Sequence, residues 1–492
     1  MRISNRDTIV ALATPPGQSG LGVVRISGPE SASVLSRVWK PKRSKELEHR
    51  KLFLGEIIDI SGEALDTATA VFLPSPHTYT GDDVVEISCH GSPLLLEKLV
   101  TLCTQAGARL AEPGEFTRRA FLSGKMDLTQ AEAVADVIHA TSEAALRSAK
   151  EQLQGRLSRE VKTLHDELLN LRAFVEACID FPEEDIEMIE REGIAARLSP
   201  LLLRLEQFLS TFHRGRLLRD GVSVALIGKP NVGKSSLLNR LAGSERAIVH
   251  ETPGTTRDVI EVSINLGGAL FHLIDTAGIR SAPDAVERMG IERSREALER
   301  ADIIIALFDA SQVLTPEDEE VLSLVKEKQH ILCFNKCDLS EAISKQTNIG
   351  VAPTPDPRGA PPAVYGWGGG TAEVTGPLSA KVLKWLPNAE PISISAKTGE
   401  GIEALFSKLQ IHTQTSTNDA SSVTITNVRH KEALVEASQA LKEAQKSLQR
   451  RESAEFCAHH LRAAQEALGR IIGLDVSEEL LDRIFSGFCI GK

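Results

Sequence analysis

Residues 228–235 read GKPNVGKS, a glycine-rich pattern of the form G-x-x-x-x-G-K-S. The apolar run Val222–Ile227 before it predicts a strand, and the residues from Ser235 onward predict a helix. A loop between a strand and a helix points backbone N–H groups and the positive end of the helix dipole at a polyphosphate. The alternative is a glycine turn that matches the pattern by chance, but such a turn would rarely lie between a strand and a helix. The middle of the chain is therefore predicted to be a phosphate-binding α/β domain.

Several side chains of this loop suit a nucleotide. Lys234 supplies a mobile cation for the β and γ phosphates, and the hydroxyl of Ser235 can bind Mg²⁺. Asn231 offers a side-chain oxygen near the phosphates, where it could help to hold a monovalent cation. The loop residues predicted to contact the nucleotide are Asn231, Val232, Gly233, Lys234, Ser235 and Ser236.

Three further motifs follow in order, each after a strand-like run. Asp275 is expected to hold Mg²⁺ through its water shell, and the N–H of Gly278 to sense the γ-phosphate. The carboxylate of Asp338 can accept two bonds from one edge of guanine that adenine cannot offer, which favours GTP over ATP. The motif residues predicted to contact GTP are Asp275, Thr276, Ala277, Gly278, Asn335, Lys336, Asp338, Ser395, Ala396 and Lys397.

The segment between the first two motifs has the composition of a switch, in which Thr255 or Thr256 could add a hydroxyl to Mg²⁺. Ile279 stands where Ras-like enzymes carry a water-orienting glutamine, so another group must position the nucleophile. Glu287 is the candidate, against the alternative of a solvated helix residue. The switch residues predicted to contact GTP are His250, Glu251, Thr252, Pro253, Gly254, Thr255 and Thr256.

Composition limits what surrounds this domain. The chain has 492 residues and a net charge of −11, so it is not a globally basic nucleic-acid binder, and its length suggests about three domains. Seven scattered cysteines without a C-x-x-C pair favour reduced thiols and a cytoplasmic location. No run of about 18 apolar residues is present, which predicts no membrane span.

The flanking segments differ in pattern. Residues 1–122 mix strands and helices and predict an α+β domain, whereas residues 123–219 and 412–492 carry helical periodicity around a GTPase domain at 220–411. Either one interrupted helical domain or two separate ones fits this order. Residues 351–391 contain eight prolines and six glycines, which predicts a flexible insertion at about 340–390.

Local signals refine the helical segments. Thr129 and Glu132 have the spacing of a capping box, and a face of small and apolar residues continues from Ala131 to Ala149. Helices are also predicted at His430–Arg451 and Ala454–Ile472. At the carboxyl end, Cys489 belongs either to an apolar docked tail or to a site thiol; the sequence after it fits lipidation poorly.

Taken over nearly its whole length, the chain resembles the MnmE or TrmE family of tRNA modification GTPases. The segments that carry the resemblance are ATPPGQSGLGVVRISG, YTGDDVVEISCHG, PGEFTRRAFLSGKMDLTQAEAVADVI, ACIDFPEEDIE, GKPNVGKSSLLN, PGTTRD, DTAGIR and DRIFSGFCIGK. The resemblance implies a multidomain α/β protein. Its parts would be an N-terminal folate-binding-like α+β domain that dimerises, an all-α helical domain and an inserted Ras-like P-loop G domain.

The resemblance also implies a function: a homodimeric, K⁺-activated cytoplasmic GTPase. With an FAD-dependent partner of the MnmG/GidA type, in a heterotetramer, it would add a (carboxymethyl)aminomethyl group at C5 of the tRNA wobble uridine. The one-carbon donor would be 5-formyl- or 5,10-methylene-tetrahydrofolate. An alternative is a ribosome-assembly GTPase that binds rRNA, which would require a basic RNA-binding domain; a membrane-remodelling GTPase would require an apolar anchor.

Family site residues map onto particular positions of this sequence. The folate contacts correspond to Arg25, Glu86, Lys125 and Lys492, and Cys489 would lie near the one-carbon unit as a catalytic group. Glu287 would be the catalytic, water-orienting acid. The metal ligands implied are Ser235 and Thr256 for Mg²⁺, and Asn231, His250, Thr252 and Thr255 for K⁺.

Overall fold

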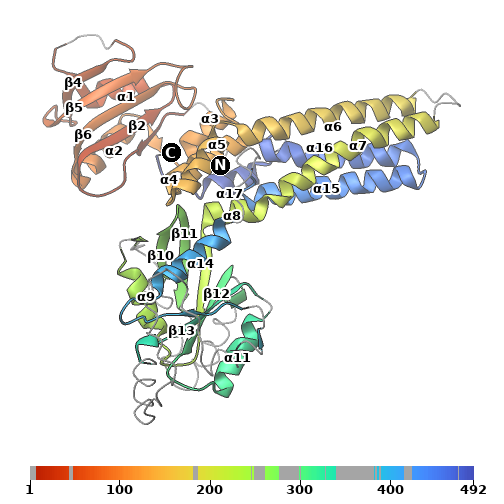
Figure 1. Cartoon of the computed structure of the whole chain (residues 1–492). Helices are drawn as coiled ribbons and strands as arrows, with labels where there is room; N and C mark the ends of the chain where they lie inside the picture. Colours follow the sequence, from red (N-terminus) through yellow and green to blue (C-terminus); the bar gives the residue numbers. More distant parts are fainter. Residues whose placement is uncertain are drawn as a thin grey trace, which may run out of the picture. The chain divides into compact units, whose positions relative to one another are not determined.

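The computed structural model of the chain separates into two compact units, each described here by itself (Figure 1). The first contains residues 1–140, 146–212 and 423–492, and the second contains residues 141–145 and 213–422. The residues that the structure describes are 7–43, 48–180, 187–244, 246–248, 261–275, 298–299, 301–326, 328–339, 382, 385–386, 389–414, 424–474 and 476–491.

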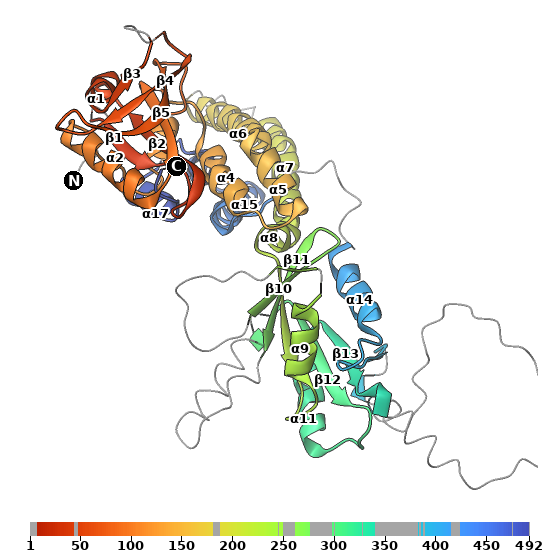
Figure 2. The ribbon, with the colours of Figure 1, turned by 90° about the vertical axis from the view of Figure 1, so that its left-hand side faces the viewer.

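The first unit begins with a seven-stranded sheet in the order β3-β4-β5-β6-β2-β1-β7. Its strands are β1 (Ile9–Leu12), β2 (Ser19–Ser27), β3 (Trp39–Pro41), β4 (Leu52–Ile58), β5 (Ala64–Leu73), β6 (Val84–Gly91) and β7 (Arg109–Leu110). All pairs are antiparallel except β1 with β7. Helices α1 (Ser31–Val38) and α2 (Pro93–Gln105) share a core with the sheet (Figure 2), and α3 (Glu115–Leu122) follows.

Strand alternation decides which side chains face away from that core. Val24 of β2 pairs with Ile87 of β6, and both are fully buried in the core that contains α1 and α2. The neighbouring pair Arg25 and Glu86 therefore points to the opposite face. Phe116 of α3 packs with β1 in a separate small apolar cluster.

Four long helices of the first unit form one bundle (Figure 1): α6 (Arg156–Asp180), α7 (Glu187–Ser210), α15 (Val428–Gln449) and α16 (Ala454–Ile472). Leu164, Leu198, Leu434 and Leu461 all lie in its core, and each is at most 1% exposed. Helices from both sides of residues 213–422 therefore share one hydrophobic core. The unit also contains α4 (Leu128–His139), most of α5 (Glu143–Leu153) and α17 (Glu478–Phe485).

The chain leaves and rejoins this bundle at adjacent points. The backbone N–H of Ile425 donates to the Thr211 hydroxyl at 3.1 Å, and Ile425 is fully buried. The hydroxyl of Thr426 donates to the side-chain oxygen of Gln152 at 3.3 Å. The exit after α7 and the return before α15 are therefore fixed to each other by a hydrogen bond.

Helix α4 begins differently from its prediction. Asp127 is the N-cap residue: its carboxylate accepts from the backbone of Gln130, whose side chain in turn accepts from the Asp127 backbone. The capping box predicted from Thr129 and Glu132 is therefore wrong. Glu132 is instead 6% exposed and paired with residues of α15, where the burial of a carboxylate is offset by charge-assisted hydrogen bonds.

The continuous helical face predicted from Ala131 to Ala149 is also interrupted, because α4 ends at His139 and α5 begins at Glu143. Ser142 lies in the gap, and its hydroxyl accepts from the backbone N–H of Ala145 at 3.1 Å. A serine side chain that satisfies a free backbone donor favours a new helix start over continuation of the old helix.

The second unit is built on a sheet in the order β14-β13-β12-β8-β11-β10-β9. Its strands are β8 (Val222–Ile227), β9 (Ala247–Ile248), β10 (Glu261–Leu266), β11 (Ala269–Asp275), β12 (Ile303–Asp309), β13 (His330–Asn335) and β14 (Ile392–Ser393). The five strands β14, β13, β12, β8 and β11 are parallel, whereas β10 is antiparallel to both of its neighbours.

Helices cover both faces of this second sheet (Figure 2). Helices α9 (Lys234–Ala242) and α14 (Ile402–Gln414) pack into one core, and α11 (Pro316–Val325) packs into the core on the other face. Helix α8 (Phe212–Asp220) precedes β8. This is the doubly wound α/β arrangement, in which ligands bind at the carboxyl ends of the parallel strands. The predicted fold class, a multidomain α/β protein, is confirmed.

Candidate nucleotide-binding site

The predicted nucleotide motifs follow the carboxyl ends of parallel strands. The phosphate loop follows β8, Asp275 ends β11, Asn335 ends β13, and Ser395 comes just after β14. Because β8 lies between β11 and β12, and β13 between β12 and β14, all four motifs share one edge of the sheet.

The phosphate loop has a backbone that requires its glycines. Gly228 and Gly233 have φ angles of +155° and +103°, and Asn231 has +62°. A Cβ atom on Gly228 would lie 2.5 Å from the Leu307 carbonyl oxygen, and one on Gly233 would lie 2.2 Å from Nδ2 of Asn335. Any larger residue at either glycine would be both strained and blocked, so the loop depends on these two positions.

The lysine of the loop is folded back over its own backbone. Lys234 Nζ donates to the carbonyl oxygens of Gly228 at 2.7 Å and Lys229 at 2.9 Å, and the residue is 8% exposed. Ser235 and Ser236 are exposed in the first turn of α9. A cation, two hydroxyls and the N-terminus of a helix thus converge, which is the donor set that a polyphosphate needs.

A buried amide connects the phosphate loop to the base-recognition motifs. Asn335 donates from Nδ2 to the Val232 carbonyl at 2.7 Å and accepts at Oδ1 from the Ala396 N–H at 2.9 Å. The hydroxyl of Ser395 donates to Oδ1 of Asp338 at 2.7 Å, which orients the carboxylate. Sequence reasoning predicted these residues as nucleotide contacts but not the bonds among them.

The end of strand β12, which carries none of the four motifs, adds a residue that they did not reveal. Asp309, the last residue of β12, is 4% exposed and accepts from Lys336 Nζ at 2.7 Å. Burial raises the pKa of Asp309, but hydrogen bonds from Lys336 and Ser311 outweigh it, so the net pKa lies below its ordinary value. Lys336, which has a φ angle of +66°, is thereby fixed beside the same sheet edge. The sequence did carry a signal for Asp309, because it is the one polar residue at the end of an otherwise apolar strand.

A different site lies on the first unit, where two predicted folate residues, Arg25 and Glu86, meet next to the C-terminal tail. Arg25 donates from Nε to Oε1 of Glu86 at 2.9 Å and from Nη1 to the Gly491 carbonyl at 3.3 Å. Gly491 has a φ angle of +93°, and a Cβ atom there would lie 2.2 Å from the Leu12 carbonyl oxygen. The penultimate residue of the chain is therefore seated beside the Arg25–Glu86 ion pair.

The surroundings of Arg25 include residues that sequence reasoning missed. Its guanidinium carbon lies 5.8 Å from the centroid of the Phe116 ring. The Tyr79 and Thr117 hydroxyls are 2.9 Å apart, and burial raises the pKa of Tyr79. Lys125, which the sequence predicted as a folate contact, follows α3 and lies beside Gly81: its Cε would be 3.5 Å from a Cβ atom placed on Gly81.

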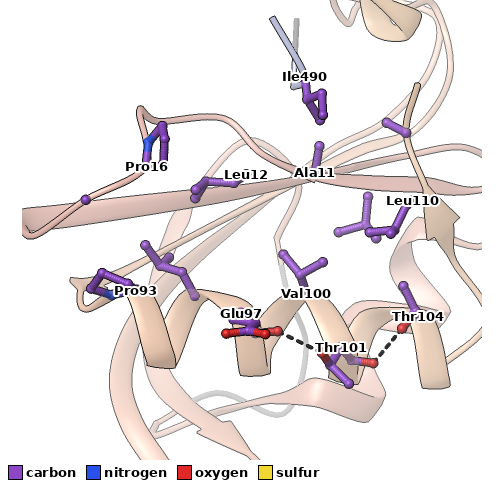
Figure 3. Close-up of a pocket in the computed structure, with 14 residues that line it drawn as sticks. Ala11, Leu12, Pro16, Pro93, Glu97, Val100, Thr101, Thr104, Leu110 and Ile490 are labelled. Atoms are coloured by element: carbon purple, nitrogen blue, oxygen red, sulfur yellow. Dashed lines mark hydrogen bonds between the residues drawn. The ribbon is translucent and has the colours of Figure 1, made fainter. Parts of the chain in front are cut away.

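An apolar cavity of about 490 Å³ adjoins the C-terminal tail (Figure 3). Ile490 lies on one side of it and α2 on the other, with β1 between them. Thr101 and Thr104 donate their hydroxyls to carbonyl oxygens of α2 itself, so the cavity wall is mainly apolar. Cys489, one residue before, is exposed, and its carbonyl accepts from the Gly114 N–H at 3.4 Å.

Comparisons with known proteins identify the family. Residues 8–125 match the family described as GTP-binding protein TrmE N-terminus, and residues 128–489 match that described as MnmE helical domain. The tRNA modification GTPase MnmE of Clostridioides difficile (strain 630) is 40% identical over 490 residues, which span 99% of this chain and 99% of that protein. The chain belongs to the MnmE family.

Another MnmE relative, from Nitrosomonas eutropha, is 42% identical over 496 residues and covers 100% of both chains. Among solved structures, a variant of Era from Aquifex aeolicus, bound to GDP.AlF4-, is 27% identical. It covers 44% of this chain and 66% of that one with a TM-score of 0.28. Assignment to the MnmE family therefore rests on full-length sequence similarity.

Part of the site predicted for an MnmE-family chain lies outside the described residues. Only the backbone of Asp275 is described. The predicted residues outside the described ranges are His250, Glu251, Thr252, Pro253, Gly254, Thr255, Thr256, Thr276, Ala277, Gly278, Ile279, Glu287 and Lys492. Across the part of the chain that the structure describes, no cluster of three His, Cys, Asp or Glu side chains could bind a metal ion.

The ion ligands predicted within the described residues suit hard cations. Ser235 presents a hydroxyl at the start of α9, and Asp275 ends the strand next to β8. Oxygen donors of this kind are those that Mg²⁺ prefers. No helix within the described ranges is long and apolar enough to cross a bilayer.

Proposed function

We propose that this chain is a GTPase that acts in tRNA modification, as the names of its relatives state for them. The observation that carries the proposal is the Asn335 bridge, which joins the phosphate loop to the Ser395–Lys397 motif beside Asp338. In this proposal the carboxyl end of one sheet would provide both the phosphate-binding loop and, in Asp338, the carboxylate that selects guanine. The domain boundaries after residues 122, 219 and 411 and the cytoplasmic location remain predictions.

The proposed chemistry assigns each group one task. Lys234 would exchange its bonds to the loop carbonyls for bonds to the β and γ phosphates. Ser235 and Thr256 would hold Mg²⁺ directly, and Asp275 would do so through water; when bound, this ion neutralises charge that develops on the phosphates. Glu287 would orient the attacking water in place of the glutamine that Ras-like enzymes use.

Potassium dependence is a direct test of the activation step. Asn231, His250, Thr252 and Thr255 are the proposed K⁺ ligands, and a fixed cation would supply transition-state charge that Ras-like enzymes obtain from an arginine. GTP turnover is expected to be about tenfold or more faster in K⁺ than in Na⁺ at equal ionic strength. Asn231→Ala should remove most of that difference while nucleotide binding persists. Equal rates of the unchanged protein in the two salts would contradict K⁺ activation.

We propose that the Arg25 site binds a tetrahydrofolate derivative. Glu86 would accept two bonds from the amino-pyrimidine edge of the pterin, while Arg25, Lys125 and Lys492 would meet polar or anionic groups. Support comes from the Arg25–Glu86 ion pair and the contact of Gly491 with Arg25, which put a cation, an anion and the tail together. Cys489 would then lie near the one-carbon unit. In this proposal the chain forms a homodimer, and the homodimer works together with an FAD-dependent partner protein.

A reconstituted reaction tests the whole proposal. The purified chain, the FAD-dependent partner, tRNA, GTP, 5,10-methylene-tetrahydrofolate and glycine as the amine donor are expected to yield a (carboxymethyl)aminomethyl group at C5 of the wobble uridine, detected by mass spectrometry of nucleosides. Omission of either GTP or folate should abolish the product. Arg25→Ala should abolish folate binding and product but leave GTP turnover intact. A wobble uridine that stays unmodified in the complete mixture would favour the alternative, a ribosome-assembly GTPase.

A further inference from the structure

The phosphate loop contains a second lysine, whose side chain is turned toward α11. Lys229 Nζ lies 3.0 Å from Oδ2 of Asp318, and the two side chains are only 10% and 3% exposed. Asp318 is the third residue of α11, and the same oxygen also accepts from the backbone and the hydroxyl of Thr315. The ion pair therefore joins the start of the phosphate loop to the start of a helix 89 residues later.

Stability alone is a weak explanation for such a pair. Burying two charges carries a large desolvation cost, which their attraction offsets only when the geometry is good. Here Oδ1 of Asp318 is buried and has no hydrogen-bond partner among the described residues, so the carboxylate is only half satisfied. Buried ion pairs that gain little net stability can still select one arrangement of the groups around them.

The ion pair fixes the residue whose backbone carbonyl, that of Lys229, accepts a hydrogen bond from Lys234. Lys234 Nζ donates to the backbone oxygens of Gly228 and Lys229. The Leu307 carbonyl lies 2.5 Å from where a Cβ atom on Gly228 would be, which limits movement of that residue. Lys229 itself is held through its side chain, which is paired with Asp318 of α11. Helix α11 is in turn anchored by Leu322 and Val325 in the adjoining core.

We propose that Lys229 and Asp318 are positioning residues that hold the first turn of the phosphate loop in its nucleotide-binding form. The proposal rests on the GTPase function proposed above. Without the pair, the residues after Gly228 would have to be ordered when the nucleotide binds, and that entropy cost would weaken binding. Because neither side chain needs to touch the reacting atoms, the affinity for GTP should depend on the pair, whereas turnover of bound GTP should not.

Two variants separate positioning from simple electrostatics. Lys229→Met removes a cation near the phosphates, so weaker GTP binding is expected for either reason. Asp318→Asn keeps that cation and removes the anion, so electrostatics alone predicts tighter binding of GTP. Positioning predicts weaker binding in both variants, by roughly three- to tenfold. Lys229→Arg, which keeps a cation able to reach a carboxylate, should restore most of the affinity.

The experiment measures Kd for a fluorescent GDP analogue, KM and kcat for GTP, and thermal unfolding, all on the full chain. Glu319→Gln on the exposed face of α11 is the matched control and should behave as the unchanged protein. The expected result is a raised Kd and KM with kcat within about twofold. If Asp318→Asn does not fold, Asp318→Glu replaces it. That variant keeps both charges, so electrostatics alone predicts unchanged binding, whereas positioning predicts weaker binding because the longer side chain displaces the carboxylate from Lys229.

Three results would overturn the inference: tighter or unchanged binding in Asp318→Asn, a lower kcat at unchanged KM, or lower thermal stability at unchanged Kd. A chain that binds no guanine nucleotide before any substitution would instead overturn the proposed GTPase function. The two failures are therefore distinguishable.

Discussion

Glu132→Ala is expected to lower the free energy of unfolding of the helical region by about 3–5 kcal/mol. The Glu132 carboxylate accepts from Nε and Nη2 of Arg429, each at 2.8 Å, and lies 2.7 Å from Nε2 of His430. Glu132 is 6% exposed and His430 is fully buried. The substitution leaves the Arg429 guanidinium, whose side chain is 16% exposed, and the buried His430 without their anionic partner, and this accounts for most of the expected loss.

Urea unfolding followed by far-ultraviolet circular dichroism measures this loss. Glu432→Ala is the matched control because Glu432 is an exposed carboxylate on α15, only a few residues from the same network. The control should change stability by no more than about 0.5 kcal/mol. Similar unfolding midpoints for the two variants would mean that the buried ion pair contributes no more than a surface charge.

The same carboxylate makes stability depend on pH. Burial raises the pKa of Glu132, but the charges and hydrogen bonds of His430 and Arg429 outweigh it and bring the pKa to about 2, against an ordinary 4.5. The stability that this group adds, about 3 kcal/mol, is therefore complete above pH 4.5 and lost as the pH falls toward 2. Glu132→Gln should remove this part of the acid sensitivity.

Asp338→Asn is expected to weaken GTP binding by about 100-fold or more. The amide would still accept from the Ser395 hydroxyl, which donates to Oδ1 of Asp338 at 2.7 Å, so the local structure should survive. Its NH₂ group, however, would face the N–H donors of guanine, and donors that meet donors in a closed site lose their hydrogen bonds. Xanthosine triphosphate, which has a carbonyl where guanine has its amino group, should bind the variant better than GTP does.

Competition of both nucleotides against a fluorescent guanine analogue measures the change in specificity. Glu400→Gln is the matched control, because Glu400 is an exposed carboxylate close to the same motif. If Asp338→Asn kept its affinity for GTP, Asp338 would not be the group that reads guanine, and the choice of GTP over ATP would need another explanation.

Sequence patterns predicted correctly those elements whose bounds are set by residues close in sequence. The strand predicted at Val222–Ile227 and the helix predicted at Ala454–Ile472 have the same bounds in the structure. Each has an uninterrupted apolar run or a regular helical face, and each is bounded by residues that favour a turn or a cap. In α16 the N-cap Ser453 accepts from the backbone of Glu455, and Gly473 follows the last turn with a φ angle of +87°.

Distant partners explain what local patterns could not predict. Glu132 has the spacing of a capping-box residue, but its side chain pairs with Arg429, 297 residues away. Within the candidate site, Asn335 bonds to Val232 across 103 residues. The motifs therefore indicated which residue types could meet a nucleotide. They carried no signal for the side chains that orient them, because those pairs form only when the sheet is assembled.

The hydrogen bond between Thr211 and Ile425 has a consequence for synthesis of the protein on the ribosome. The bundle core joins α6 and α7 to α15 and α16, and residues 213–422 come between the two pairs. At ordinary rates of translation, those residues take roughly 10 to 40 s to emerge. The nucleotide-binding unit can fold in that interval, whereas α6 and α7 must wait with their apolar faces uncovered. During this interval, α6 and α7 would be a binding site for chaperones that recognise exposed leucine-rich helices.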